Sequence, residues 1–560
     1  MAAEKSGNSI SIYLAIGLPV ITLGLLTGSV TDPVNAPKLA ILGAVAIACL
    51  FLLFADWDFI RSRESTLFKF GLILFVFWSL LSVVMSDSPL SQNIYGVYGR
   101  NTGFLAYLFL AILALAASHF SEMKAIEKVL LGFYTSVGIN LIYCMWVIVF
   151  GDFVGWQNPY KAILGTFGNP NFISSFLGMS VGPQVAHLLA GKNRVRVFYF
   201  VTLSVTAFGL IRASSLQGFV VSAVSIGLVL IYWISNRFIS RRYTFLALLL
   251  GALGALTAVW GALGSGPLRS VMSQPTVALR EQYWYAGIQM GLKNPVFGVG
   301  MDSYGDWYRR SRGAQALITP GPETVTNVAH NVFIDIFSYG GFPLLAVYAF
   351  LAVIGLVIAL RIILKHGSFE PTRISLAAVF ITYQIQSIIS INQIGLAIWG
   401  WTSLGLLISL DRILRQQRSP ISNSKPKIGK SQQFISKGLI GSLGLLAGFF
   451  IACPPLVADM KWASALKSRQ LSAFESALQG SYFSPVNSFR LAQAVETLEK
   501  SKLPDLAVKY ARRGVDFNPQ SLNAWEMLYY ATNSTENERT KAKAKLISLD
   551  PLNMKWQNLK

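Results

Sequence analysis

The sequence is poor in cysteine, histidine and acidic residues. Its 560 residues include 3 cysteines, 4 histidines and 26 aspartates and glutamates, and charged residues make up 13% of the chain. Cys49, Cys144 and Cys453 lie far apart inside apolar stretches, without the spacing to histidine or to one another that a metal site needs. We therefore expect them to be small buried residues, and we predict no metal site.

Familiar catalytic signatures are also absent. The sequence contains no Walker A loop and no HExxH, CxxC or GxSxG motif. The stretch GVGMDSYG at 298–305 lacks the GxGxxG spacing and a preceding soluble strand, so it does not predict a dinucleotide site. Nothing in the chain therefore points to a cofactor.

What the sequence does have is long apolar stretches. Hydrophobic residues make up 53% of the chain, and the mean hydropathy is +0.50. Stretches of about 20 residues are long enough to cross a bilayer, and in lipid they must be helical because the backbone has no water to bond. They predict an all-α, polytopic membrane bundle of about 12–13 transmembrane helices, centred on residues 10–30, 38–56, 67–86, 103–121, 126–150, 171–191, 195–212, 216–234, 243–263, 336–364, 373–391, 393–411 and 437–456.

The net charge of +21 is concentrated in alternate loops rather than on one contiguous basic face, which argues against nucleic-acid binding. By the positive-inside rule, these loops and the N-terminus lie in the cytoplasm. An odd number of spans then places the C-terminus outside the cytoplasm, and we expect a multi-pass protein of a bacterial cytoplasmic membrane. The cationic loops carry Arg61 and Arg63; Lys192, Arg194 and Arg196; Arg237, Arg241 and Arg242; and the run from Arg412 to Lys437.

Three outward loops follow from this topology, at 87–102, 151–170 and 264–330. The last is too long for a simple connection, and loops of that length are usually functional. Within it, residues 279–292 (LREQYWYAGIQMGL) have helical periodicity with an aromatic-rich face. This pattern predicts a helix that lies at the membrane surface.

Beyond the last apolar segment the sequence becomes polar and helix-forming. Pro485, Pro519 and Pro551 are spaced 34 and 32 residues apart, with Ala-rich amphipathic stretches between them. A period near 34 is typical of tetratricopeptide repeats. We therefore divide the chain into a transmembrane domain, 1–456, and an extracytoplasmic helical-repeat domain, 457–560, whose two or so units are expected to pack on another part.

One histidine stands at the border of the long loop and an apolar helix. His330 is followed by Asn331, and a histidine at such a boundary can take a proton from a hydroxyl near neutral pH. The alternative is a purely structural histidine that caps or anchors the start of the helix. Position alone leaves both interpretations open.

Three arginines lie in or beside the outward loops. Arg280 opens the expected surface helix, close to Trp284; Arg100 ends the first outward loop; and Arg212 sits at a short outward turn. The planar guanidinium pairs well with phosphate oxygens, so these positions suit a diphosphate. The alternative for each is snorkelling at the membrane interface or a loop salt bridge.

Other polar groups of these loops have simpler interpretations as well. In GTFGNPNFISSF at 165–176, Asn-Pro favours a turn and Asn171 can cap a helix that starts at 172. Capping does not explain why both Asn169 and Asn171 face outward at a membrane entrance, so both are candidates for substrate binding. Asn331 and Trp284 are candidates for substrate binding as well. Arg309, Arg310 and Arg312 are expected to form a solvated or lipid-facing basic surface.

The order of these motifs resembles the O-antigen ligase and polymerase superfamily of membrane glycosyltransferases. The more specific features are an Arg with a Trp a few residues on, then NPxxGxG, then His-Asn before a helix with Gly-Gly ten residues later. The segments that carry the resemblance are YGVYGRNTGFLAY (95–107), GTFGNPNFISSF (165–176), LREQYWYAGIQMGLKNPVFGVGMDSYGDWY (279–308) and AHNVFIDIFSYGGFPLL (329–345).

The resemblance implies a GT-C-type fold and a metal-independent, inverting transfer of a glycan from an undecaprenyl-diphosphate carrier at the outer face of the membrane. His330 matches the proposed base, and Arg280 matches the arginine that contacts the diphosphate. Relatives often carry another arginine where this chain has Leu216, so Arg212 or Arg100 would have to supply the second contact.

The implied partners are the lipid-linked glycan donor, the bilayer, and a lipid, protein or glycan acceptor. A ligase and a polymerase use the same donor chemistry, and the sequence does not separate them. A polysaccharide transporter and a non-enzymatic scaffold are the alternatives from other classes. The C-terminal repeats suggest docking of a protein or of the glycan acceptor.

Overall fold

The fold was analysed in a computed structural model that describes residues 2–55, 65–156, 158–237, 241–262, 265–267, 269, 275–365, 367–417 and 437–559. Within these ranges the chain is helical, with no strand beyond one isolated bridge between Ser481 and Ser484. The prediction of an all-α polytopic membrane protein is confirmed. Arg61, Arg63 and most of the cationic run before Lys437 lie outside the described residues.

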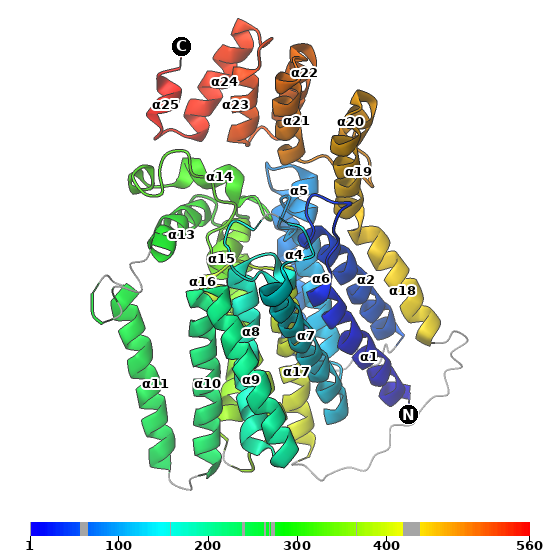
Figure 1. Cartoon of the computed structure of the whole chain (residues 1–560), viewed down its shortest axis with the longest axis vertical. Helices are drawn as coiled ribbons and strands as arrows, with labels where there is room; N and C mark the ends of the chain where they lie inside the picture. Colours follow the sequence, from blue (N-terminus) through cyan, green and yellow to red (C-terminus); the bar gives the residue numbers. More distant parts are fainter. Residues whose placement is uncertain are drawn as a thin grey trace.

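Each of the thirteen predicted apolar segments coincides with one helix of the bundle (Figure 1). This agreement is expected, because a long apolar segment in lipid can form all of its backbone hydrogen bonds only as a helix. The helices are α1 (Ala2–Leu23), α2 (Asn35–Phe54), α4 (Thr66–Val84), α6 (Phe104–Ala117), α7 (Met123–Phe150), α8 (Pro170–Ala190), α9 (Asn193–Ala213), α10 (Leu216–Arg237), α11 (Arg241–Ala262), α15 (Val332–Ile363), α16 (Pro371–Ile389), α17 (Ile394–Gln416) and α18 (Lys437–Ala452).

Fewer helices than the expected twelve to thirteen are both long and apolar enough to cross a membrane. Among the described residues, eight are long and apolar enough, or nine if α18 and the helix after it form one bent span. The apolar part of α1 is only Ser9–Leu23, and α6 is Phe104–Ala117. At about 1.5 Å per residue, such stretches are shorter than a hydrocarbon core of about 30 Å.

Small residues let the helices of the bundle approach closely. Gly43 of α2 faces Gly448 of α18, and a Cβ on Gly448 would lie 2.1 Å from the carbonyl oxygen of Gly43. Such close backbone contact is the usual way in which membrane helices associate. α17 lies at the centre of the bundle, and 94% of its most apolar 18-residue stretch is buried against its neighbours.

Short helices gather at the end of the bundle opposite the start of α1 (Figure 1). They are α5 (Leu90–Tyr95), the 3₁₀ turn η1 (Gly165–Phe167), α13 (Pro275–Lys293), α14 (Tyr304–Ser311) and the 3₁₀ turn η2 (Ala314–Leu317). The helix predicted at 279–292 is therefore present as part of α13, which packs against α15.

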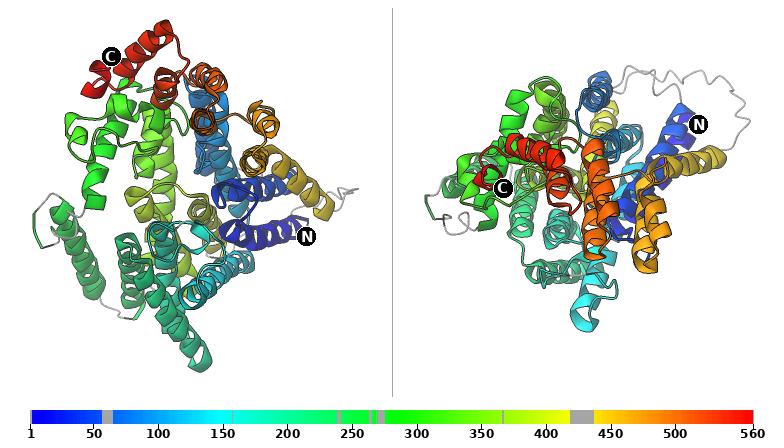
Figure 2. Two further views of the ribbon diagram at one scale, coloured as in Figure 1. Left: turned by 45° about the horizontal axis from the view of Figure 1, so that its top comes forward. Right: turned by 90° about the horizontal axis from the view of Figure 1, so that it is seen from above.

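The C-terminal helices rise from the same end of the bundle (Figures 1 and 2). They enclose a hydrophobic core of their own, which includes Trp462, Trp525 and Trp556. Each of the three regularly spaced prolines lies three residues before a helix, and the assignment to tetratricopeptide repeats stays a prediction. The helices are α19 (Pro454–Ser468), α20 (Leu471–Leu478), α21 (Ser488–Lys500), α22 (Pro504–Phe517), α23 (Leu522–Tyr530), α24 (Glu536–Leu549) and α25 (Met554–Gln557).

The arginines after α13 do not form the solvated or lipid-facing surface expected from the sequence. Arg309 and Arg312 are buried, and both pair with the fully buried Asp550 between α24 and α25, at 3.3 and 2.6 Å. Arg310 donates to the side chain and the backbone carbonyl of Gln520 at 2.7 and 3.0 Å. The expectation was wrong because Gln520 and Asp550, which cover these arginines, lie more than two hundred residues further along the chain.

We predict that Asp550→Asn loosens the C-terminal domain from the bundle. The change leaves the buried guanidinium of Arg312 without its counter-charge and Arg309 with only Glu323 at 3.7 Å, and breaking a buried ion pair typically costs about 3–5 kcal/mol. Denaturant titration of the purified protein, followed by tryptophan fluorescence, measures the effect. The control is Glu475→Gln, which breaks an exposed ion pair with Lys509 and is expected to change stability by about 0–1 kcal/mol. Equal effects of the two changes would contradict this account of the interface.

Candidate active site

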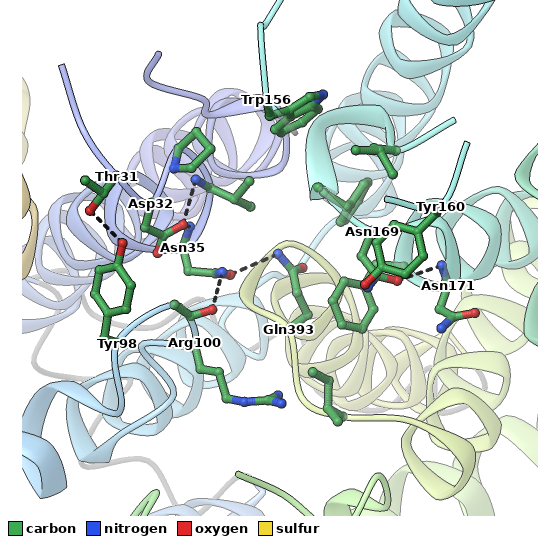
Figure 3. Close-up of a pocket in the computed structure, with 18 of the residues that line it drawn as sticks. Thr31, Asp32, Asn35, Tyr98, Arg100, Trp156, Tyr160, Asn169, Asn171 and Gln393 are labelled. Carbon is green, nitrogen blue, oxygen red and sulfur yellow. Dashed lines mark hydrogen bonds between the residues drawn. The ribbon is translucent and has the colours of Figure 1, made fainter. Parts of the chain in front are cut away.

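A cavity of about 870 Å³ opens at the end of the bundle that carries the C-terminal domain. Its walls come from the loop between α1 and α2, the turn around Arg100, the loop before α8, and the loop between α16 and α17. Arg280 and His330 complete the lining. Figure 3 shows Arg100 pointing into the space between these loops, with Asn171 on the other side. The volume lies in the range of small-molecule and cofactor sites.

Two glycines shape the turn that presents Arg100. Gly96 and Gly99 have positive φ angles of 88° and 78°, which glycine adopts without strain. Asp302 anchors this turn, because it accepts hydrogen bonds from the Val97 amide at 2.9 Å and from the Thr102 hydroxyl at 3.2 Å. The position of Arg100 is therefore set by the backbone of this turn, and its guanidinium forms no ion pair with a described residue.

His330 lies in a strained turn directly before α15. Its φ of 59° is left-handed, which is uncommon for a residue with a Cβ and often marks a functional site. Its ring stacks on Tyr283 at a centroid distance of 5.5 Å. The cap of α15 is Asn331, whose Oδ1 accepts from the amides of Phe333 and Ile334 at 3.0 and 3.3 Å. The capping role considered for His330 is therefore performed by Asn331.

Burial, with two neighbouring positive charges, keeps the imidazole of His330 neutral. Burial lowers the pKa of His330 to about 3, and the positive charges of Arg100 and Arg280 add to the shift. Burial also lowers the pKa of Arg280. Neither guanidinium donates a hydrogen bond or forms an ion pair with any residue that the structure describes. The cavity therefore holds a neutral imidazole beside two guanidiniums that form no ion pair with a described residue, which suits an anionic ligand.

Amide and aromatic side chains form the opposite wall (Figure 3). Asn169, and not Asn171, caps α8, which begins at Pro170 rather than at 172. The correction has a physical reason, since proline is favoured at the first helical position and its ring fixes the required φ. Asn171 instead accepts from Ser215 Oγ at 2.7 Å, and Asn169 donates to Tyr160 at 3.4 Å.

Five of the eight side chains selected from the sequence line the cavity, namely Arg100, Asn169, Asn171, Arg280 and His330. The other three do not. Arg212 is exposed on the last turn of α9, Trp284 packs against the hydrophobic core, and Asn331 is engaged as the cap of α15.

Several lining residues were missed by the sequence analysis. Thr31, Asp32 and Asn35 fall in the short connection expected between the first two membrane segments, and this connection is longer than expected because α1 ends at Leu23. Gln393 was placed inside a membrane segment, but it caps α17 and donates to Asn35 at 3.5 Å. The signal was present in the polar run TDPVNAP at 31–37, whose two prolines interrupt an otherwise apolar stretch.

A family model described as O-antigen ligase matches residues 199–349. The chain carries an O-antigen ligase domain. The match runs from α9 into α15, so it includes both Arg280 and His330. Comparisons with curated proteins and with solved structures each found no match. The match supports the similarity of the chain to the ligase- and polymerase-type glycosyltransferases of membranes.

The wall of the cavity that lies outside the matched ligase domain is held by the C-terminal domain. Asp459 of α19 is fully buried and accepts from the amides of Thr31 and Asp32 at 2.7 and 2.8 Å, and from Arg490 at 3.3 Å. Tyr98 bonds the Thr31 hydroxyl at 2.6 Å and stacks on Phe489 at 4.6 Å. The C-terminal helices thus fix two of the segments that line the cavity.

We predict that Asp459→Asn frees the loop between α1 and α2. The asparagine would turn an N–H group toward donors that now meet a carboxylate, and a hydrogen bond to a charged group contributes about 1.5–3 kcal/mol. Amide hydrogen exchange at Thr31 and Asp32 should accelerate by about tenfold or more. Glu496→Gln, on the exposed face of α21, is the control and should change neither amide. Unchanged exchange in Asp459→Asn would show that the C-terminal domain does not hold this wall.

Proposed function

We propose that the protein transfers a glycan from an undecaprenyl-diphosphate carrier to an acceptor hydroxyl at the outer face of the cytoplasmic membrane. The observation that carries the proposal is the neutral His330 beside the guanidiniums of Arg100 and Arg280, within one cavity that the O-antigen ligase domain helps to build. Lipid, protein or a second glycan can supply the hydroxyl, since the chemistry at the donor is the same for a ligase and a polymerase.

Arg100 and Arg280 bind the diphosphate of the donor. Guanidinium groups form forked, charge-assisted hydrogen bonds with phosphate oxygens. As the bond between the sugar carbon and the phosphate oxygen breaks, negative charge grows on the leaving diphosphate. Two cations that already stand at the cavity wall stabilise that charge. The sequence offered either Arg100 or Arg212 for the second contact with the diphosphate. We assign this contact to Arg100, because Arg100 lines the cavity and Arg212 does not.

His330 removes the proton of the acceptor hydroxyl. The hydroxyl oxygen attacks the sugar carbon from the side opposite the diphosphate, so one displacement inverts the configuration at that carbon. The proton passes to the imidazole and the electron pair of the broken bond leaves with the diphosphate. Because a bound diphosphate offsets the charges of Arg100 and Arg280, it raises the pKa of His330 and strengthens the base when the donor is present.

We expect His330→Ala to abolish most glycan transfer, since a positioned general base contributes about 10²–10⁴-fold to a rate. Arg100→Gln and Arg280→Gln should each lower transfer by about 10²–10³-fold, the usual effect of removing one electrostatic donor. The measurement is attachment of the glycan to its acceptor in cells that lack the native copy, with accumulation of the lipid-linked donor as the second readout.

The matched control is Lys293→Gln, which removes a cation from the exposed end of the same helix α13 and should leave transfer intact. Expression and membrane insertion are compared for all variants. Full transfer by a folded His330→Ala protein would refute the catalytic role of His330. Loss of transfer in Arg212→Gln as severe as in Arg100→Gln would instead return the second diphosphate contact to Arg212.

The pH dependence of transfer provides a separate prediction. The kcat/KM value reports ionisations of the free enzyme, and a His330 pKa of about 3 leaves the imidazole neutral at all higher pH values. Protonation would block the base, so His330 should cause no loss of kcat/KM between about pH 5 and 8. Transfer assays in membranes across this range test the point. A fall in kcat/KM below about pH 6.5 that vanishes in a residual-activity His330 variant would contradict it.

A further inference from the structure

A second cavity, of about 460 Å³, lies at the end of the bundle opposite the candidate active site. The ends of α10, α15 and α17 and the start of α16 form its walls. Four cations line it, Arg361, Lys365, Arg373 and Arg415, against the single carboxylate of Asp411. The proposed glycan transfer uses none of these residues.

The charge in this cavity is only partly compensated. Asp411 pairs with Arg415 one turn away on the same helix, at 2.7 Å. Arg361 and Arg373 come from different helices, and neither forms an ion pair or donates a hydrogen bond to a residue within the described ranges. Cations in loops follow from the topology of a membrane protein, but topology does not require them to converge on one hollow.

The hollow is braced by contacts between distant segments. Tyr232 donates to the Ser368 carbonyl at 3.3 Å and packs against the Phe369 ring at a centroid distance of 5.3 Å, and Ser235 donates to the Ile363 carbonyl at 3.3 Å. These contacts join α10 to the connection between α15 and α16, so the walls are set before any ligand arrives. Preorganised walls reduce the entropy lost on binding.

An amide at the cavity wall is left with an unused acceptor. Asn236 lines the cavity and donates to the Tyr232 carbonyl at 2.7 Å, but its buried Oδ1 accepts no hydrogen bond from any described residue. A buried acceptor without a partner is uncommon in folded proteins and calls for an explanation. Because this atom is buried, a hydroxyl or ammonium group of a ligand reaches it once the Asn236 side chain turns toward the cavity.

We propose that this cavity binds the phosphate of an anionic phospholipid headgroup. Arg361 and Arg373 bind the phosphate oxygens, and Asn236 accepts from a headgroup hydroxyl or ammonium. The position supports this assignment, because the cavity lies at the ends of apolar helices, where headgroups meet the protein. Basic pockets between membrane helices are a recurrent form of lipid recognition. Inorganic phosphate shares the same chemistry and is the alternative source that the experiment separates.

The test is thermal unfolding of the full-length protein in detergent micelles. The probes are short-chain phosphatidylglycerol, short-chain phosphatidylcholine and inorganic phosphate. A ligand that binds only the folded state raises the unfolding temperature. Phosphatidylglycerol should raise it by several degrees, and phosphatidylcholine should not. Arg361→Gln combined with Arg373→Gln should remove at least half of the shift.

The matched control is Arg194→Gln combined with Arg196→Gln, which removes two exposed cations at the start of α9 on the same end of the bundle. It should keep the full shift. An equal loss in both double variants would overturn the proposal, because it would mean diffuse attraction between a basic surface and anionic micelles. An equal shift with inorganic phosphate would assign the site to a free anion instead of a lipid. Arg361→Gln alone, at an exposed position, tests the same point if the double variant does not fold.

Discussion

The shape of the candidate active site depends on the burial of one carboxylate, that of Asp459. A carboxylate removed from water must have its lone pairs satisfied, and Asp459 finds its partners in Thr31, Asp32 and Arg490. The loop between α1 and α2 is drawn to the C-terminal domain for this reason. Tyr98 is held in the same contact, and two residues later the chain presents Arg100. The cavity is thus a joint product of the membrane bundle and of helices that follow it by several hundred residues.

The site itself is built at some expense to the stability of the fold. His330 has a strained backbone, and Arg100 and Arg280 stand near it without forming an ion pair with any described residue. Strained residues and unpaired polar groups of this kind persist where the surrounding structure over-determines them, and they cluster at functional sites. The strain falls on the residues that the proposed transfer uses, while the carboxylates that brace the walls, Asp302 and Asp459, are fully bonded. An anionic donor would supply the missing charge.

The two ends of the bundle differ in how they use positive charge. At one end, two cations face a neutral base in a cavity shaped by five separate loops. At the other end, cations from three helices converge on a hollow that contains no comparable base. Both arrangements favour anions, but only the first places a proton acceptor beside the phosphate. This difference separates a site for group transfer from a site for binding alone.

The sequence by itself determined the helices of this protein and much of its candidate site. Apolar length and local spacing are properties of short stretches, and so are the motifs around Arg280 and His330 and the Asn-Pro turn at 169. They therefore appear in the structure close to where the pattern places them. Tertiary structure alone decided the rest: that Arg309 and Arg312 are buried against Asp550, that Arg212 does not line the cavity, and that Thr31 and Gln393 belong to its wall. Each of these depends on a partner far away in the chain, and no local periodicity records which distant side chain will satisfy a buried charge.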